Sequence, residues 1–216
     1  MIWEGVQNDK DIKFICRYRW KPKTLGGNIE VTAIEYDENI AKIYKENFSN
    51  DKVIITDAHQ YLLEHFREYD IIWSSPPCPT HSRVRKTLGT KRKKDGTIYE
   101  QNKPVYPDMT LYEEILLLDG YYDGLYVVEN VIPWYEPLIV PQKLGRHCFW
   151  SNIELPQQKF EKRGSFNNTE ELAIKLGYDI SNWSGVNKKL LLRNCVEPEV
   201  GLYIFNLLKG ELQNDN

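Results

Sequence analysis

The chain of 216 residues is 41% hydrophobic and 27% charged, and its formal net charge is −3. This composition is typical of a globular protein with one sizeable core, and the net charge by itself does not indicate a nucleic-acid-binding protein. The sequence has no apolar run near the roughly 18 residues of a membrane span and no signal-peptide pattern at its amino terminus. We therefore expect a cytoplasmic protein without a membrane partner, whose scattered cysteines are reduced and bind no metal.

Strand-like and helix-like segments alternate from residue 28 onward. Apolar runs predict strands over 28–35, 53–55, 69–73 and 124–128, and helical spacing predicts helices over 38–48, 58–66, 111–118 and 200–208. Asp108 is a candidate cap for the third of these helices. Strands that alternate with helices predict an α/β fold with a mostly parallel, doubly wound sheet.

Two acids close neighbouring strands in the first part of the chain. Glu35 ends the strand 28–35 and can accept hydrogen bonds from both hydroxyls of a ribose, as an acid does in dinucleotide-binding folds. Asp57 follows the next strand and can accept from an adenine amine, and Tyr36 can lie against the adenine face. The alternative is that both acids cap the helices that follow, which requires no cofactor.

A rigid turn places a thiol directly after the strand 69–73. In Ser-Ser-Pro-Pro-Cys-Pro, the prolines around Cys78 fix φ and remove backbone donors, so the sulfur has a defined direction. The carboxyl end of a strand is where open α/β sheets bind ligands. We interpret Cys78 as a nucleophile, and a buried structural cysteine is the alternative.

A second polar element follows the strand 124–128, where the chain reads Glu129-Asn130-Val131-Ile132-Pro133. A carboxylate at the tip of a neighbouring strand can meet the thiol of Cys78. An isolated glutamate is more often a surface or capping residue. Because both elements follow predicted strands, we favour a functional pairing of Cys78 with Glu129.

The Pro-Pro-Cys turn and the later Glu-Asn-Val, in this order and at this separation, resemble the small cytosine-C5 DNA methyltransferases. The resemblance implies a Rossmann-like fold that transfers a methyl group from S-adenosyl-L-methionine to C5 of a cytosine flipped out of duplex DNA. It implies that Cys78 is the covalent nucleophile at C6 and that Glu129 engages N3 and the exocyclic amine. Asn130 would position the loops on the DNA side of the site.

The same resemblance assigns contacts to the cofactor. The residues expected to touch it are Glu35, Tyr36, Asp57, Pro76 and Asn194. Asn194 lies in the segment 193–198, which resembles the last motif of the family with Arg193 in place of a glycine. The segment 144–150 resembles an arginine-containing motif that supports the catalytic pocket, so Arg146 is expected there.

Basic residues crowd the segment after Cys78, and they are Arg83, Arg85, Lys86, Lys91, Arg92, Lys93 and Lys94. In the resembling family this loop closes on DNA around the extruded base, which implies that Ser82, Arg83, Arg85 and Lys86 contact DNA. We expect His81 and Ser82 to shape the mouth of the pocket. A solvated charge run is the alternative.

We divide the chain into a catalytic core over 1–150, of which 1–26 is aberrant, a very small target-recognition region over 151–188, and a carboxyl-terminal motif and helix over 189–216 that return to the core. Candidate DNA contacts in the second part are Lys162, Arg163, Asn167, Asn168 and Trp183. We expect the protein to act as a monomer.

The first motif of the family is missing. The family opens with a strand and a glycine-rich loop, which lets the backbone approach the cofactor because glycine has no Cβ. Residues 11–26 carry basic side chains and a proline there instead. We hypothesise that this segment is an out-of-frame translation, because suitable codons for 10–26, read one base later, give a hydrophobic strand followed by Ala-Gly-Ile-Gly-Gly.

Two other functions stay open at this point. The chain can be a catalytically impaired relic that binds DNA without turnover, which cofactor affinity would distinguish. It can also be an RNA cytosine-C5 methyltransferase, because the same thiol chemistry serves cytosine in tRNA. Competition between duplex DNA and tRNA would separate these substrates.

Sequencing the gene tests the frame hypothesis. We expect the codons of residues 10–26, read one base later, to encode the hydrophobic strand and the Ala-Gly-Ile-Gly-Gly loop, with the two frames rejoining at 25–27. Codons that do not permit this reading would refute the hypothesis.

Overall fold

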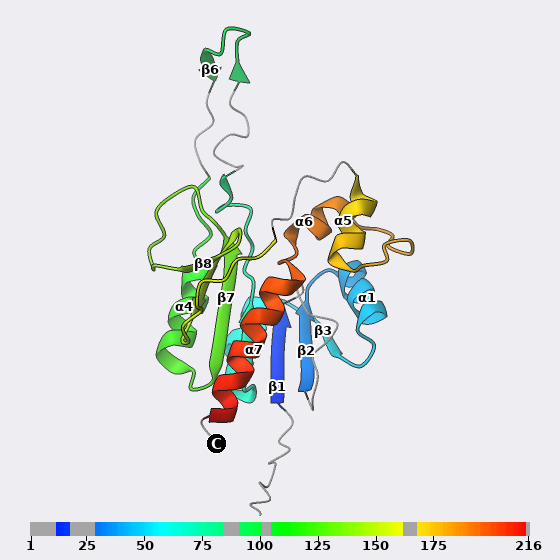
Figure 1. Ribbon diagram of the computed structural model, residues 1–216, viewed down its shortest axis with the longest axis vertical. Coiled ribbons are helices and arrows are strands. Elements are labelled where there is room, and N and C mark those ends of the chain that lie inside the picture. The colour runs from blue at the N-terminus through cyan, green and yellow to red at the C-terminus, as the bar shows by residue number, and fades with distance from the viewer. Residues whose placement is uncertain (1–11, 18–28, 84–90, 101–104, 162–167, 215–216) are drawn as a thin grey trace, which may run out of the picture.

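The structure is a computed structural model that describes residues 12–17, 29–83, 91–100, 105–161 and 168–214. Its main sheet has the strand order β3-β2-β1-β4-β7-β9-β8 (Figure 1). These strands are β1 (Ile12–Arg17), β2 (Ile29–Glu35), β3 (Lys52–Ile55), β4 (Ile71–Ser74), β7 (Leu125–Val131), β8 (Gln142–Leu144) and β9 (His147–Ser151). The first five in spatial order pair in parallel, and β9 pairs antiparallel with β7 and β8. The predicted α/β fold is confirmed.

Helices cover both faces of this sheet. They are α1 (Glu38–Asn47), α2 (Ala58–His65) with the short 3-10 helix η1 (Phe66–Glu68), α4 (Thr110–Tyr121), α5 (Thr169–Leu176), α6 (Lys188–Asn194) and α7 (Pro198–Asn214). Successive side chains of a strand point to opposite faces. Ile71 and Trp73 accordingly pack in a cluster with α1 and α7, whereas Ile72 packs with α2 and α4. The central strands are therefore buried on both sides, as a parallel sheet requires.

Strand β1 lies in the middle of the sheet, between β2 and β4. Residues 12–17 belong to the segment that lacks the family's first motif, yet they pair in register with both neighbours. The place of the expected glycine-rich loop, immediately after β1, falls in 18–28, outside the described residues.

Strand β7 is longer than the sequence predicted. It continues through Glu129 and Asn130 to Val131, because β9 pairs with it along this whole stretch. Glu129 and Asn130 therefore have fixed strand geometry and do not begin a loop.

The cap of α4 also differs slightly from the prediction. Met109 occupies the N-cap position, and Asp108 accepts a hydrogen bond from the backbone N–H of Thr110.

The region from α5 to α6 forms an apolar cluster against α1 (Figure 1). Trp183 is 4% exposed within this cluster, so the prediction that it contacts DNA is wrong. Asn168 caps α5 by accepting from the backbone N–H of Glu171 at 2.7 Å. Lys162, Arg163 and Asn167 lie outside the described residues.

A small hairpin of β5 (Lys91–Arg92) and β6 (Ile98–Glu100) projects from the body of the molecule (Figure 1). Its turn is closed by Gly96 at φ 88°, a conformation that favours glycine. Lys93 and Lys94 are exposed at this turn.

None of the described helices is long and apolar enough to cross a membrane.

A buried carboxylate connects α4 with α2 and β4. Glu114 is 1% exposed, accepts a hydrogen bond from the hydroxyl of Ser74, and lies with Oε1 3.1 Å from Nδ1 of His59. The hydrogen bond to Glu114 is the main cause of a raised pKa at His59, and partial burial opposes it. Glu113 and Asp57 add smaller attractions.

We predict that the contact between His59 and Glu114 stabilises the fold more at acidic than at alkaline pH. Because the folded pKa of His59 is raised, its contribution is complete below the unfolded pKa of about 6.5 and is lost as the pH rises through the folded pKa. Urea unfolding of the wild type and His59→Gln should give free energies of unfolding that converge as the pH rises. A difference independent of pH would contradict this.

Candidate active site

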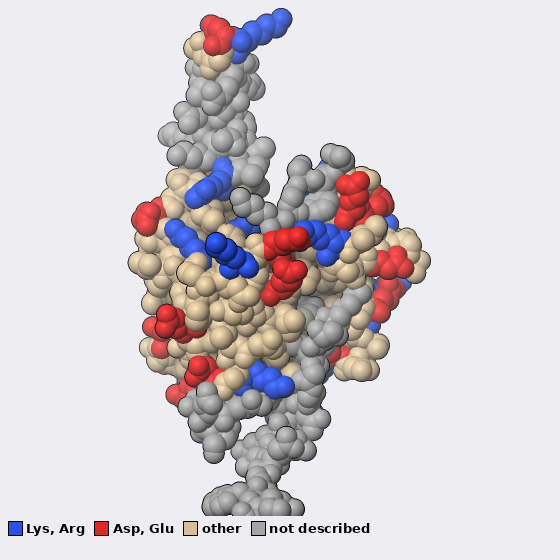
Figure 2. Space-filling model, in the orientation of Figure 1, with Lys and Arg blue, Asp and Glu red and all other residues tan. Residues whose placement is uncertain are grey.

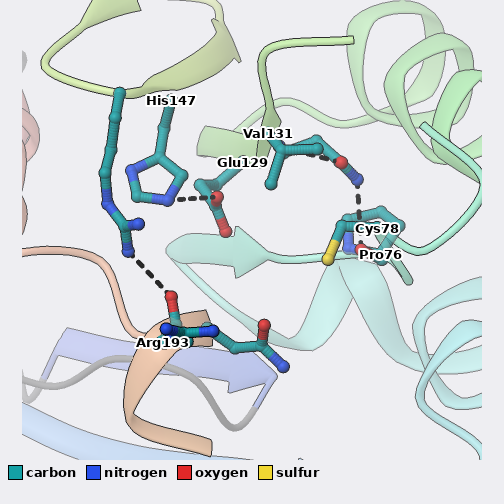
Figure 3. A pocket seen from close by; sticks show the side chains of 9 residues that line it. Pro76, Cys78, Glu129, Val131, His147 and Arg193 are labelled. Atoms are coloured by element: carbon teal, nitrogen blue, oxygen red, sulfur yellow. Dashed lines mark hydrogen bonds and ion pairs between the residues drawn. The ribbon is translucent and has the colours of Figure 1, made fainter. Parts of the chain in front are cut away.

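A cavity of about 120 Å³ opens at the carboxyl edge of the sheet (Figure 3). It is lined by Pro76, Cys78, Glu129, Asn130, Val131, Arg146, His147, Arg193 and Asn194. Strands β4 and β7 are parallel neighbours, with Ser74 paired to Val128, so the turn after β4 and the end of β7 meet at one edge. The structure thus brings together Cys78 and Glu129, the two residues whose pairing the sequence favoured.

Asn130 fixes the position of the cysteine turn relative to β7. Its Nδ2 donates to the backbone carbonyl of Pro76 at 3.1 Å, and its Oδ1 accepts from the N–H of Val131 at 2.9 Å. Asn130 is 1% exposed. Its predicted role in positioning loops agrees with these contacts, but its assignment as a DNA contact is corrected, because its amide is buried and bonded to backbone.

The segment after Cys78 is attached to the segment after β7. The carbonyl of Cys78 accepts from the backbone N–H of His81 and of Ser82, each at 3.1 Å. Trp134 in turn donates from its backbone to the carbonyl of His81 at 3.0 Å and from its indole to Thr80 at 2.9 Å. These bonds hold the turn on both sides of the sulfur.

We expected His81 to shape the mouth of the pocket, but it is a core residue. It is fully buried, and its Nδ1 lies 2.5 Å from the hydroxyl of Tyr135. Burial lowers the pKa of His81, although Asp108 opposes the shift, so the neutral ring is favoured.

The described thiols differ in exposure. Cys78 is partly exposed, whereas Cys148 and Cys195 are buried. Burial raises the pKa of Cys148 to about 11, which disfavours its thiolate. Cys195 donates from its sulfur to the carbonyl of Leu191 at 3.4 Å. Of these three, Cys78 is the thiol that a ligand in the cavity can reach.

A series of ionisable groups leads away from Glu129, and Figure 3 shows its first pair, His147 and Glu129. His147 has Nε2 3.6 Å from Oε1 of Glu129 and Nδ1 3.8 Å from Oε2 of Glu197. Arg146 completes the chain with Nε 2.8 Å from Oε1 of Glu197. His147 and Glu129 are almost fully buried, with side-chain exposures of 4% and 5%.

Arg146 lines the cavity, as expected from the segment 144–150, and it also contacts backbone carbonyls. Its Nη2 donates to the backbone carbonyls of Arg193 at 2.8 Å and Cys195 at 3.1 Å, at the end of α6. It therefore ties the turn between β8 and β9 to the segment between α6 and α7. The sequence analysis did not identify His147 or Glu197. His147 follows Arg146 directly and Glu197 lies in the same segment as Asn194, but no pattern in the sequence distinguished either residue.

The predicted cofactor residues lie in two groups. Pro76 and Asn194 line the cavity. Glu35 and Asp57 stand at the ends of the adjacent strands β2 and β3, where Oε1 of Glu35 accepts from the backbone N–H of Tyr36 at 2.8 Å. Asp57 caps α2 by accepting from Gln60, as the alternative reading proposed, while Asp37 and not Glu35 caps α1. Tyr36 is 77% exposed.

The predicted DNA contacts are only partly described. Ser82 pairs with Pro133 in an isolated bridge, and the exposed Arg83 donates from Nε to the carbonyl of Pro133 at 3.4 Å. Arg85 and Lys86 lie outside the described residues. Figure 2 shows basic side chains around the upper part of this face and at the tip of the projecting hairpin.

Comparison with known proteins agrees with this fold and with the cysteine turn. A solved structure of the Entamoeba histolytica methyltransferase EhMeth has a TM-score of 0.54, with 11% identity over 94% of this chain and 99% of that chain. Residues 23–105 match the family model described as C-5 cytosine-specific DNA methylase. The Type II methyltransferase M.Bsp6I of Bacillus sp. (strain RFL6) is 30% identical over 98 residues, which are 44% of this chain and 31% of that protein.

The fold is Rossmann-like and is similar to that of EhMeth. Residues 23–105 of this chain are thus similar to the cytosine-C5 DNA methyltransferases, and the match to M.Bsp6I agrees with this. The matching segment spans about a third of the length of the curated relative. The family match includes Cys78 but ends before Glu129, so the grouping of these two residues rests on the geometry of the cavity.

We predict that Asn130→Ala destabilises the protein by about 1–3 kcal/mol, because it leaves the buried carbonyl of Pro76 without this donor. Asn152→Ala is a matched control: Asn152 also bonds two backbone groups near β7, but it is exposed at the opposite end. Chemical denaturation measures both free energies, and alkylation of Cys78 should change in Asn130→Ala alone. Equal effects of the two substitutions would contradict the proposed tie.

Proposed function

We propose that the chain is a DNA (cytosine-5-)-methyltransferase of the restriction-modification type that acts through a covalent cysteine adduct. The observation that carries this proposal is that Cys78 and Glu129, from two neighbouring strands, line one cavity (Figure 3). A cavity of roughly 150 Å³ accepts benzene in another protein, so a cavity of about 120 Å³ has the size of a single ring. This supports an extruded pyrimidine as the occupant.

The two side chains have complementary tasks in this reaction. The thiolate of Cys78 adds to C6 of cytosine, while Glu129 donates a proton to N3 and accepts a hydrogen bond from the exocyclic amine. The addition makes C5 an enamine carbon, which is nucleophilic. After the methyl group has been transferred, C5 loses its proton to solvent water and the bond between C6 and the sulfur breaks. The thiolate returns to Cys78, and the proton on N3 returns to Glu129.

The strand-end residues fit S-adenosyl-L-methionine as the methyl donor. Carboxylate oxygens accept hydrogen bonds from ribose hydroxyls and from an amine, which suits Glu35 and Asp57 at the carboxyl ends of adjacent parallel strands. Tyr36, which is exposed next to Glu35, would lie against the adenine. Pro76 and Asn194 would contact the cofactor from the side of the cavity. When bound, the cofactor supplies an electrophilic sulfonium methyl group.

Duplex DNA is the proposed substrate. The family match supports it, and so does the position of Ser82 and Arg83 on the chain directly after the cysteine turn. Arg83 is exposed, so its guanidinium can pair with a backbone phosphate. Arg85 and Lys86, which follow it in the sequence, would extend this contact.

A covalent trap tests the proposal. Duplex DNA that contains 5-fluorocytosine should form a stable complex with the protein in the presence of S-adenosyl-L-methionine, because fluorine at C5 cannot leave as a proton. The complex should be absent with Cys78→Ser and unchanged with Cys148→Ser, which alters a buried thiol of raised pKa. Mass spectrometry of the digested complex locates the linked residue.

The same assay separates the other functions. A complex that survives Cys78→Ser would refute the nucleophile. A complex with tRNA but not with duplex DNA would make RNA the substrate. A complex that forms only after residues 10–26 are replaced by the strand and loop of the shifted frame would show that this chain is an impaired form of the enzyme.

A further inference from the structure

His147 lies between two carboxylates in a nearly dry part of the site. Its Nε2 is 3.6 Å from Glu129 and its Nδ1 is 3.8 Å from Glu197, and the three side chains are 4%, 5% and 13% exposed. Each imidazole nitrogen thus faces one carboxylate. An imidazole with an acid on both sides gains most when both of its nitrogens carry protons.

The charged groups around His147 come from four elements. Glu129 belongs to β7, Glu197 to the segment before α7, and Arg146 to the turn before β9, where it is 2.8 Å from Glu197. Arg193 on α6 lines the same cavity. Arg146 is paired with Glu197, and His147 lies at ion-pair distance from Glu129, so a protonated His147 balances the charge of that carboxylate.

Other described residues near His147 are Cys148, Phe149 and Lys143. Cys148, the next residue in β9, has a pKa raised to about 11 by burial, so it is a neutral thiol at physiological pH. The ring of Phe149 lies with its centroid 6.2 Å from that of His147. Lys143 in β8 is exposed, so water screens its charge. None of these supplies the pairing that Glu129 offers.

We propose that His147 is a positioning residue that orients Glu129 and resupplies its proton during attack on the cytosine. This inference rests on the proposed function. As the sulfur of Cys78 bonds to C6, the proton on Nε2 of His147 passes to the carboxylate of Glu129, which delivers a proton to N3. When the bond between C6 and the sulfur breaks, N3 returns its proton to Glu129, and Glu129 returns one to His147.

Two features of the site favour this role over simple packing. The pair lies at 3.6 Å without substrate, and catalytic hydrogen bonds often tighten only when the substrate is bound. Histidine is also the side chain whose charge changes near neutral pH, whereas the guanidinium of Arg146 stays protonated. The site therefore pairs the permanent charge of Arg146 with Glu197 and the titratable side chain of His147 with Glu129.

The pairing itself is tested by NMR, without any need for activity. In the full chain labelled at histidine, the ring of His147 should lose its proton at lower pH in Glu129→Gln and in Glu197→Gln than in the wild type. His81 is the internal control, since it is buried beside Tyr135 and should titrate alike in all three proteins. A titration of His147 that neither substitution changes would overturn the proposal, even if the protein methylates DNA.

The catalytic part is tested by the pH profile of methyl transfer. The rate should fall on the alkaline side in the wild type, and His147→Gln should lower it about 100-fold or more at neutral pH, as expected for loss of a proton donor. His147→Arg keeps the charge but cannot titrate, so it should keep more activity than His147→Gln and lose the alkaline fall.

If the rate of methyl transfer by His147→Arg still falls at alkaline pH, the proposed role of His147 is wrong. Replacing a histidine that is only structural would leave the pH profile of the rate unchanged. If the wild type methylates neither DNA nor RNA, including the version with the restored loop, the proposed function fails. In that case the NMR titration still decides whether His147 and Glu129 are paired.

Discussion

The hydrogen bond from Asn130 to the carbonyl of Pro76 is the contact on which the site depends. It joins the last residues of β7 to the turn after β4, and these two elements carry Glu129 and Cys78. The bond is possible because β4 and β7 are adjacent parallel strands whose carboxyl ends meet at one edge. The prolines restrict the turn, and the buried amide of Asn130 fixes where that turn lies.

The antiparallel strand β9 adds the second half of the site. By pairing with β7 up to Val131, it keeps Glu129 inside a strand and brings His147 to the same place. Arg146 then ties this hairpin to the segment between α6 and α7, which supplies Glu197. Residues from distant parts of the chain thus form one series of ionisable groups, in which Glu129 lies beside His147, and Glu197 lies beside both His147 and Arg146.

The sequence predicted the sheet and the meeting of Cys78 with Glu129, because strand periodicity and strand-end polarity are local signals. It did not reveal His147 or Glu197, whose roles depend on the antiparallel return of β9 and on the approach of α6. It misplaced Trp183, because an aromatic residue in a polar segment suggests a surface position, whereas the structure buries it in the apolar cluster of α1, α5 and α6. The basic run of 11–26 hid a strand, because β1 is set by pairing with β2 and β4 on both sides.

The central claim is that Cys78 and Glu129 together attack cytosine, and exchange of the C5 hydrogen tests it most directly. Addition at C6 makes C5 an enamine carbon that can exchange its hydrogen with water even when no methyl group is transferred. Duplex DNA with tritium at C5 of cytosine should therefore release tritium with the wild type, about 100-fold more slowly with Glu129→Gln, and not at all with Cys78→Ser. Release that Cys78→Ser leaves unchanged would contradict the account.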